Sequence, residues 1–275
     1  MKKGHWNDSK EYTVIHGSSS SDFAEEESEA MQKMWNKRAV EGNEKLPDRL
    51  QHKLELNSII ASVPKSSIIL DAGCGSGYSS RSLNEKGFSV YGIDFAEDLI
   101  KKAQKESDSE ISFQVADILN LPFSDSKFDV VLTQRVIQNL GNLENQFTAI
   151  NEIFRVLKRG GKFLMLEQSK EGIANLNKIR TENDLDPIIV PWHNLPIDES
   201  LFFKKLEDNN WFKLSSIKDF STYFLFSRVF HPLFVHPETP TYDSKINKIA
   251  SVIQASDINI SPSVSHVKLY IFEKL

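Results

Sequence analysis

The sequence of 275 residues contains a single cysteine, Cys74, which excludes an intrachain disulfide and gives no reason to expect an oxidising compartment. It has no run of 18 apolar residues, and no apolar stretch follows its two N-terminal lysines, so neither a transmembrane helix nor a signal peptide is expected. Basic residues are not in excess, since the formal net charge is −5, and a nucleic-acid backbone would meet no general positive field. We expect a cytoplasmic, soluble monomer or homodimer whose partner is a small molecule, with no nucleic acid and no membrane.

The sequence changes character near Pro64. Residues 1–21 are polar and end in a run of serines, and two helical patterns follow, the second over 48–63. Residues 1–63 are therefore expected to form an arm and cap helices. From residue 64 onward short apolar runs alternate with helical patterns, which predicts a doubly wound α/β domain over 64–275. Strands are predicted at 67–70, 89–94, 111–117, 128–134 and 162–169, and helices at 79–87, 97–107 and 144–161.

The last hundred residues carry a weaker pattern. A helix is predicted over 202–212 and a strand over 213–220, and the alternating residues 266–275 are expected to end the sheet as an edge strand. The segment between these strands, at about 221–262, is rich in aromatic residues and prolines and is too apolar for a disordered loop. We expect it to be a helical insertion that packs over the functional edge of the sheet.

The stretch IILDAGCGSG, residues 68–77, places a glycine-rich turn directly after the first predicted strand. In doubly wound sheets ligands bind at the carboxyl ends of the strands, and glycine lets the backbone approach them closely. A dinucleotide fingerprint reads G-x-G-x-x-G, whereas here the glycines are two residues apart and Asp71 stands two residues before Gly73. An acid in that position repels phosphate but accepts hydrogen bonds from an ammonium group. The turn therefore predicts a ligand that carries a cation and no phosphate nearby.

This turn resembles the first motif of the class I S-adenosylmethionine-dependent methyltransferases. The resemblance covers residues 64–170 and the two C-terminal strands. It implies S-adenosylmethionine as the cofactor. It also implies a Rossmann-like, doubly wound sheet of seven mostly parallel strands, with N-terminal helices and a helical insertion before the last strand.

The resemblance further implies cofactor-binding residues at the carboxyl ends of successive strands. Asp94 matches the acid that binds both ribose hydroxyls, and Asp117 matches the acid that accepts from the adenine amino group. Ile118 would lie beside the adenine ring, and Gln134 would line the methionine end. The full implied set is Asp71, Gly73, Gly75, Gly77, Asp94, Phe95, Asp117, Ile118 and Gln134, with no metal site.

The turn after the fourth predicted strand departs from the family's pattern. Many relatives read V-L-E-H-L, whereas this chain reads V-I-Q-N-L, so that Gln138 and Asn139 replace an acid–histidine pair. A general base must then come from elsewhere, and the candidates are His193, in a Trp-His-Asn triplet, and Glu167, which ends the fifth strand. Arg135, Arg180 and Arg228 are candidates for presenting a guanidinium fork to an acidic or phosphorylated acceptor, and Arg135, directly after the fourth strand, is the best placed. Each also has a purely structural interpretation, as a packed loop histidine, a cap or an ion-pair partner.

The favoured function is methyl transfer to an oxygen or nitrogen of a small molecule, with a modified sugar or sugar nucleotide as the leading acceptor. Two alternatives stay open. One is a non-catalytic module that binds S-adenosylmethionine or a protein partner, and the other is a protein methyltransferase. Intact acids at Asp71, Asp94 and Asp117 disfavour a degenerate site, but they bear on cofactor binding only.

Overall fold

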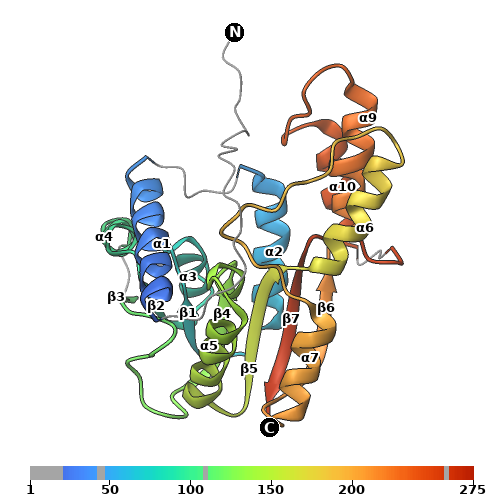
Figure 1. The fold of residues 1–275 in the computed structure, drawn as a ribbon. Helices are drawn as coiled ribbons and strands as arrows, with labels where there is room; N and C mark the ends of the chain where they lie inside the picture. The colour runs from blue at the N-terminus through green and yellow to red at the C-terminus, as the bar shows by residue number, and fades with distance from the viewer. Residues whose placement is uncertain (1–20, 42–46, 108–110, 257–259) are drawn as a thin grey trace.

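The computed structural model describes residues 21–41, 47–107, 111–256 and 260–275, so the predicted polar arm lies outside the described residues up to residue 20. Its centre is a seven-stranded sheet in the order β3-β2-β1-β4-β5-β7-β6 (Figure 1). Neighbouring strands pair in parallel, except that β7 runs antiparallel to both β5 and β6. The predicted Rossmann-like α/β fold with a mostly parallel sheet is confirmed.

Strands and helices alternate through the first five strands, as the sequence predicts. The strands are β1 (Ile68–Ala72), β2 (Ser89–Asp94), β3 (Ser112–Val115), β4 (Phe128–Gln134), β5 (Leu157–Gln168), β6 (Phe212–Asp219) and β7 (Val267–Lys274). The helices before β6 are α1 (Ser21–Glu41), α2 (Arg49–Ser62), α3 (Tyr78–Asn84), α4 (Glu97–Lys105), the short 3-10 turn η1 (Ile137–Asn139), α5 (Leu143–Val156), α6 (Lys170–Thr181) and α7 (Glu199–Asp208). The predicted boundary near residue 63 falls in the connection between α2 and β1, and the division into two parts stays a prediction.

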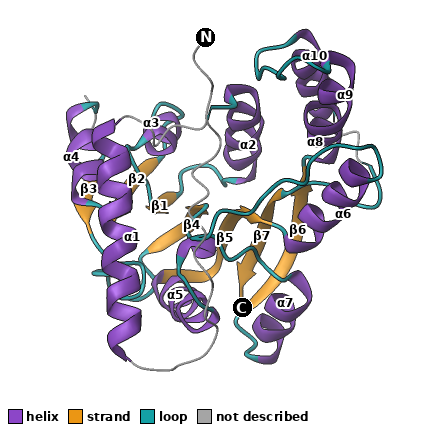
Figure 2. Ribbon diagram, turned by 45° about the horizontal axis from the view of Figure 1, so that its top comes forward, coloured by secondary structure: helices purple, strands orange, loops and turns teal. Residues whose placement is uncertain are grey.

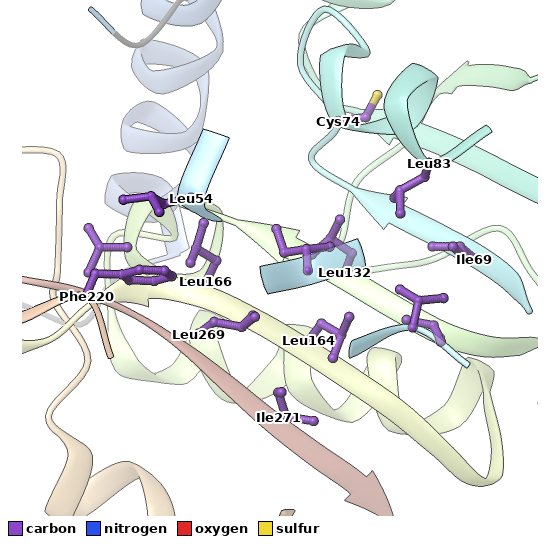
Figure 3. Close-up of a cluster of buried hydrophobic side chains, with 14 of the residues drawn as sticks. Leu54, Ile69, Cys74, Leu83, Leu132, Leu164, Leu166, Phe220, Leu269 and Ile271 are labelled. Atoms are coloured by element: carbon purple, nitrogen blue, oxygen red, sulfur yellow. The ribbon is translucent and has the colours of Figure 1, made fainter. Parts of the chain in front are cut away.

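Helices cover both faces of the sheet, and each face has its own apolar core. Alternate residues of β5 point to opposite faces, so that Leu164 and Leu166 join one core while Phe163 and Met165 join the other. The first core also receives side chains of α2, α3 and α4, and Figure 3 shows Leu54 of α2 lying over this layer. The second receives α5 and α7. Both faces of the central strands are therefore buried, as their apolar sequences require.

Two predicted details are wrong. The helix predicted over 144–161 ends at Val156, because Leu157 adopts an extended conformation and pairs with Phe128 of β4. Strand β5 therefore begins at Leu157 rather than at residue 162. The C-terminal strand is not an edge strand, since β7 lies between β5 and β6. Residues 267–272 of β7 are all buried, which fits an inner strand, and β6 forms the edge.

The segment between β6 and β7 is helical, as predicted. It contains α8 (Ser221–Leu225), a π-helical turn η2 (Phe226–Phe230), α9 (His231–Val235) and α10 (Lys245–Gln254). Figure 2 shows α2 standing between α3 on one side and this helical segment on the other. Polar contacts fix the segment to α2, since the Tyr223 hydroxyl and the Arg228 Nη2 each donate to Asp48 at 2.7 Å. The insertion therefore lies against the N-terminal helices beside the carboxyl edge of the sheet.

Candidate active site

The glycine turn follows β1 at the carboxyl edge of the parallel strands. Gly73, Gly75 and Gly77 have φ angles of +83°, +55° and +78°, in the left-handed region that favours glycine. A Cβ at Gly73 would lie 2.2 Å from Cγ2 of Val136, whereas a Cβ at Gly75 would meet nothing within 4 Å. Val136 therefore closes the turn at its first glycine, and the space beside Gly75 is open to a ligand.

Asp71 is fully buried at the end of β1. Its Oδ2 accepts a hydrogen bond from Ser80 Oγ at 2.6 Å, while Oδ1 has no partner among the described residues. Burial raises the pKa of this carboxyl to about 6, although the bond from Ser80 opposes the rise. The free oxygen lies beside the glycine turn, and it is suited to accept from an ammonium group or from water. The neighbouring Cys74 belongs to the apolar core, and burial raises its thiol pKa, so it is not a reactive thiolate.

Asp94 ends β2 next to the glycine turn. Its Oδ2 accepts from the Gly75 backbone N–H and its Oδ1 accepts from the Ala96 N–H, both at 2.9 Å. Burial raises its pKa to about 6, and these backbone hydrogen bonds oppose the rise. The carboxylate thus joins the turn after β1 to the turn after β2. A ligand that bridges the two turns would meet it first.

The remaining predicted cofactor residues lie at the same edge. Asp117 follows β3 and is exposed, and its Oδ1 accepts from the Leu119 N–H at 2.9 Å. Ile118 is buried beside it, and Gln134 ends β4 half-buried. The structure therefore brings the predicted set together along β1, β2, β3 and β4. Their individual roles in binding stay a prediction.

Helix α1 covers the turn after β2, a feature that the sequence reasoning missed. Gln32 Nε2 donates to the Phe95 carbonyl oxygen at 2.7 Å, and Asn36 Oδ1 accepts from the Asp98 N–H at 3.2 Å. Between them Trp35 packs with Phe95 in a small apolar cluster. The amphipathic pattern before residue 41 predicted a cap helix, but it could not show which turn that helix covers.

Glu167, at the carboxyl end of β5, holds the turn that follows β4. Its Oε1 accepts from the N–H groups of Val136 and Ile137 at 3.0 Å, and its Oε2 accepts from that of Gln138 at 3.3 Å. The side chain is fully buried, and burial raises its pKa to about 7. Gln138 extends the same network, since its Oε1 accepts from the Gln168 N–H at 2.8 Å. The two carboxylate oxygens are therefore committed to backbone rather than directed at an acceptor.

Arg135 follows β4 with a φ of +58°, which is strained for a residue with a side chain. Its Nη2 donates to Glu55 Oε1 on α2 at 2.5 Å, and Gln51 Nε2 donates to the same oxygen at 2.8 Å. His52, also on α2, lies over the ring of Tyr78 with their centroids 4.5 Å apart. This set of α2 residues beside the glycine turn is the second feature that sequence reasoning missed.

His193 lies in the loop between α6 and α7, in edge contact with Trp35 of α1 at a centroid distance of 6.4 Å. It is buried, and its Nδ1 has no partner among the described residues. Burial and the nearby Arg38 charge lower its pKa to about 4, so the imidazole is neutral at pH 7. The loop is tied to β5 because Asn194 Nδ2 donates to Gln168 Oε1 at 2.9 Å. His193 is thus held near the carboxyl edge as an unprotonated imidazole.

These features fit S-adenosylmethionine. The open space beside Gly75, the unpartnered Asp71 Oδ1 and the Asp94 carboxylate suit a ligand with an ammonium group and ribose hydroxyls. Fold and site together resemble those of the class I S-adenosylmethionine-dependent methyltransferases. Residues 70–165 match the family model described as "Methyltransferase domain". This segment is less than half of the chain, and over it the chain is similar to methyltransferases that use S-adenosylmethionine.

Two named relatives are methyltransferases as well. A malonyl-[acyl-carrier protein] O-methyltransferase of Hamiltonella defensa is 30% identical over 143 residues, which cover 47% of this chain and 54% of the relative. A demethylmenaquinone methyltransferase of Staphylococcus epidermidis is 29% identical over 174 residues, which cover 60% and 68%. This chain therefore spans about half the length of the first of these relatives and two thirds of the second.

Solved structures share the fold at lower identity. Phosphoethanolamine N-methyltransferase 1 of Haemonchus contortus superposes with a TM-score of 0.61 at 17% identity, covering 92% of this chain and 50% of that one. The PH0226 protein of Pyrococcus horikoshii OT3 superposes with a TM-score of 0.56 at 18% identity, covering 84% and 93%. At such identities the likeness establishes the fold alone.

The described residues contain neither a metal-binding cluster nor a helix that could span a membrane. No group of three or more His, Cys, Asp or Glu side chains in the described ranges could hold a metal ion. In the same part of the chain, no helix is long and apolar enough to cross a membrane.

Proposed function

We propose that this chain transfers a methyl group from S-adenosylmethionine to an oxygen or nitrogen of a small molecule. The observation that carries the proposal is the meeting of two sets of residues at one edge. Asp71, Asp94 and the glycine turn form the donor site, and a polar group of α2 and β4 residues touches the same turn. The names of the relatives, a malonyl-carrier and a demethylmenaquinone methyltransferase, support acceptors of small-molecule type. A modified sugar or sugar nucleotide stays our leading acceptor.

Methyl transfer requires the donor and the acceptor to be aligned more than it requires reactive side chains. When bound, the cofactor would supply a methyl group on a sulfonium. The acceptor oxygen or nitrogen would bond to that methyl carbon as its bond to sulfur breaks, S-adenosylhomocysteine would leave, and the acceptor's proton would pass to a base. Asp94 and Asp117 are proposed to accept from the ribose and the adenine, and Asp71 from the ammonium end. Helix α1 and the loop of His193 are proposed to exclude water from this edge, because Trp35 of α1 packs with Phe95 and contacts His193.

The three candidate catalytic residues take different proposed roles. His193 is the proposed base, because its imidazole is neutral at pH 7 and its Nδ1 has no partner among the described residues. Glu167 is a positioning residue, since it binds three N–H groups of the turn that carries Val136 against Gly73. Arg135 is already paired with Glu55, which disfavours its predicted role as a fork for an acidic acceptor.

Methyl transfer from isotope-labelled S-adenosylmethionine to a panel of alcohols, sugars and amines tests the proposal. We expect label in at least one small acceptor, with much less transfer by Asp94→Ala. Label that enters only protein would support a protein methyltransferase instead. Cofactor binding with no transfer to any compound or protein would support the non-catalytic alternative.

A further inference from the structure

A buried polar cluster joins α2, the end of β4 and the helical insertion beside the glycine turn. Arg228 Nη2 donates to Asp48 Oδ2 at 2.7 Å and to Gln51 Oε1 at 3.1 Å, and Gln51 Nε2 donates to Glu55 Oε1 at 2.8 Å. Arg135 completes the chain of contacts through its bond to Glu55. We name Asp48, Gln51, Glu55, Arg135 and Arg228 the α2 cluster.

The α2 cluster touches the donor site at two points. Arg135 immediately precedes Val136, whose side chain fills the position above Gly73. His52 lies beside Glu55 on α2, and its ring contacts that of Tyr78, the residue that follows Gly77, in a tilted arrangement. Figure 2 shows the same arrangement at the level of helices, with α2 between α3 and the insertion. A molecule bound to the α2 cluster would therefore lie next to the cofactor-binding turn.

The charges within the α2 cluster balance. Two guanidinium groups, Arg135 and Arg228, face two carboxylates, Glu55 and Asp48, in ion pairs of 2.5 and 2.7 Å. The adjacent Arg180 donates to the backbone carbonyls of Arg228 and Asp186. Since Arg135 and Arg228 each already pair with a carboxylate, a carboxylate or phosphate on the acceptor would find both positive charges of the α2 cluster paired.

One buried acceptor atom in the α2 cluster has no hydrogen-bond donor among the described residues. Glu55 is fully buried, and while its Oε1 receives two donors its Oε2 has none among the described residues. A buried carboxylate oxygen without a donor is costly. Arg135 offers the complement, because a guanidinium carries five N–H donors and Arg135 uses one of them in its bond to Glu55. Within this one ion pair, a buried acceptor oxygen lacks a donor and the guanidinium has further donors that no described residue is seen to use, which suits a neutral group that both donates and accepts.

We propose that Glu55 and Arg135 bind a hydroxyl group of the methyl acceptor, with Glu55 Oε2 accepting its O–H and Arg135 donating to its oxygen. The site then selects neutral hydroxyl compounds over carboxylates. This inference rests on the proposed function and narrows its acceptor class. It also separates this chain from the relative named for a malonyl acceptor, which offers a carboxylate.

Glu55→Gln provides a test, because it removes the negative charge and leaves Arg135 without its counter-ion. Glycerol and acetate are the probes, each titrated into the protein saturated with S-adenosylhomocysteine and followed by saturation-transfer NMR. We expect the wild type to bind glycerol and to bind acetate at least about tenfold more weakly. Glu55→Gln should lose glycerol and gain acetate, each by about tenfold. Glu207→Gln, the same change on an exposed residue of α7, should behave as the wild type.

Equal affinity for the two probes in the wild type, or a preference that Glu55→Gln leaves unchanged, would overturn the inference. If Glu55→Gln does not fold, Glu55→Asp keeps the charge and must keep the preference for glycerol; a switch to acetate would contradict the argument. Calorimetry with S-adenosylhomocysteine distinguishes failure of the proposed function from failure of the hydroxyl site at Glu55 and Arg135. Absence of cofactor binding defeats the proposed function, whereas cofactor binding with an acetate preference defeats only the assignment of Glu55 and Arg135.

Discussion

Replacing Glu167 by alanine should destabilise the fold and not merely slow a reaction. The substitution removes the acceptor for three backbone N–H groups, those of Val136, Ile137 and Gln138, at donor–acceptor distances of 3.0, 3.0 and 3.3 Å. Each buried donor left without a partner costs about 1–3 kcal/mol. Since water and local shifts recover part of that loss, we expect Glu167→Ala to lower the free energy of unfolding by about 3 kcal/mol, the low end of the sum for three donors.

Glu167→Gln should cost less, about 1–2 kcal/mol. Its amide oxygen can still accept from Val136 and Ile137, whereas its amide nitrogen would face the Gln138 N–H as a second donor. Urea denaturation at pH 8 measures both variants, and the dependence on urea should keep its slope. The matched control is Glu207→Ala on the exposed face of α7, expected within about 0.5 kcal/mol of the wild type.

The pH dependence of stability gives a second check on Glu167. Burial raises its pKa from 4.5 to about 7, so between these values the folded chain holds a proton that the unfolded chain has released. The contribution of this group to stability is therefore largest below pH 4.5 and declines as pH rises to about 7. Glu167→Gln should remove that decline. A Glu167→Ala variant as stable as the control would refute the assignment of Glu167 as the support of the turn.

Three further predictions concern the donor site and the base. In thermal unfolding Gly73→Ala should lower the free energy of unfolding by about 1–3 kcal/mol more than Gly87→Ala does. Both glycines have positive φ, but only a Cβ at Gly73 would clash with Val136, at 2.2 Å, so equal losses would contradict this. The association constant for S-adenosylhomocysteine should fall below pH 6, since the pKa values of Asp94 and Asp71 are both raised to about 6 and the protonated acids accept hydrogen bonds poorly. In calorimetry Asp94→Asn should reduce that fall to about tenfold per pH unit or less, the part that Asp71 contributes. His193→Ala should lower kcat by on the order of 10²-fold with unchanged cofactor affinity, and wild-type turnover would exclude His193 as the base.

The sequence could predict the donor site because its signals are local. Each strand's apolar run is followed within a few residues by the turn that carries Gly73, Asp94 or Asp117. In a parallel sheet those turns must meet at one edge, so order along the chain was sufficient to place them together. The helical insertion was predicted from a different local signal, its aromatic-rich and apolar composition.

The contacts that define the rest of the site join residues far apart in sequence. Glu55 and Arg135 are 80 positions apart, Gln32 and Phe95 are 63 apart, and Tyr223 and Asp48 are 175 apart. No spacing rule connects such pairs, because they depend on how α1, α2 and the insertion dock on the sheet. The last strand was expected at the edge of the sheet, and this prediction is wrong for a similar reason. The pairing of β6 outside β7 depends on long-range contacts rather than on local sequence.

Calorimetric titration of S-adenosylhomocysteine into the wild type and Asp94→Ala tests the central claim most directly, because it needs no knowledge of the acceptor. We predict one binding site per chain in the wild type and a loss of about 2 kcal/mol in Asp94→Ala, since a charged hydrogen-bond acceptor is removed from the turn. Unfolding of the variant by heat, compared with that of the wild type, controls for folding. A wild type that binds no S-adenosylhomocysteine, or a folded Asp94→Ala with unchanged affinity, would contradict the account of the glycine turn and its neighbouring acid.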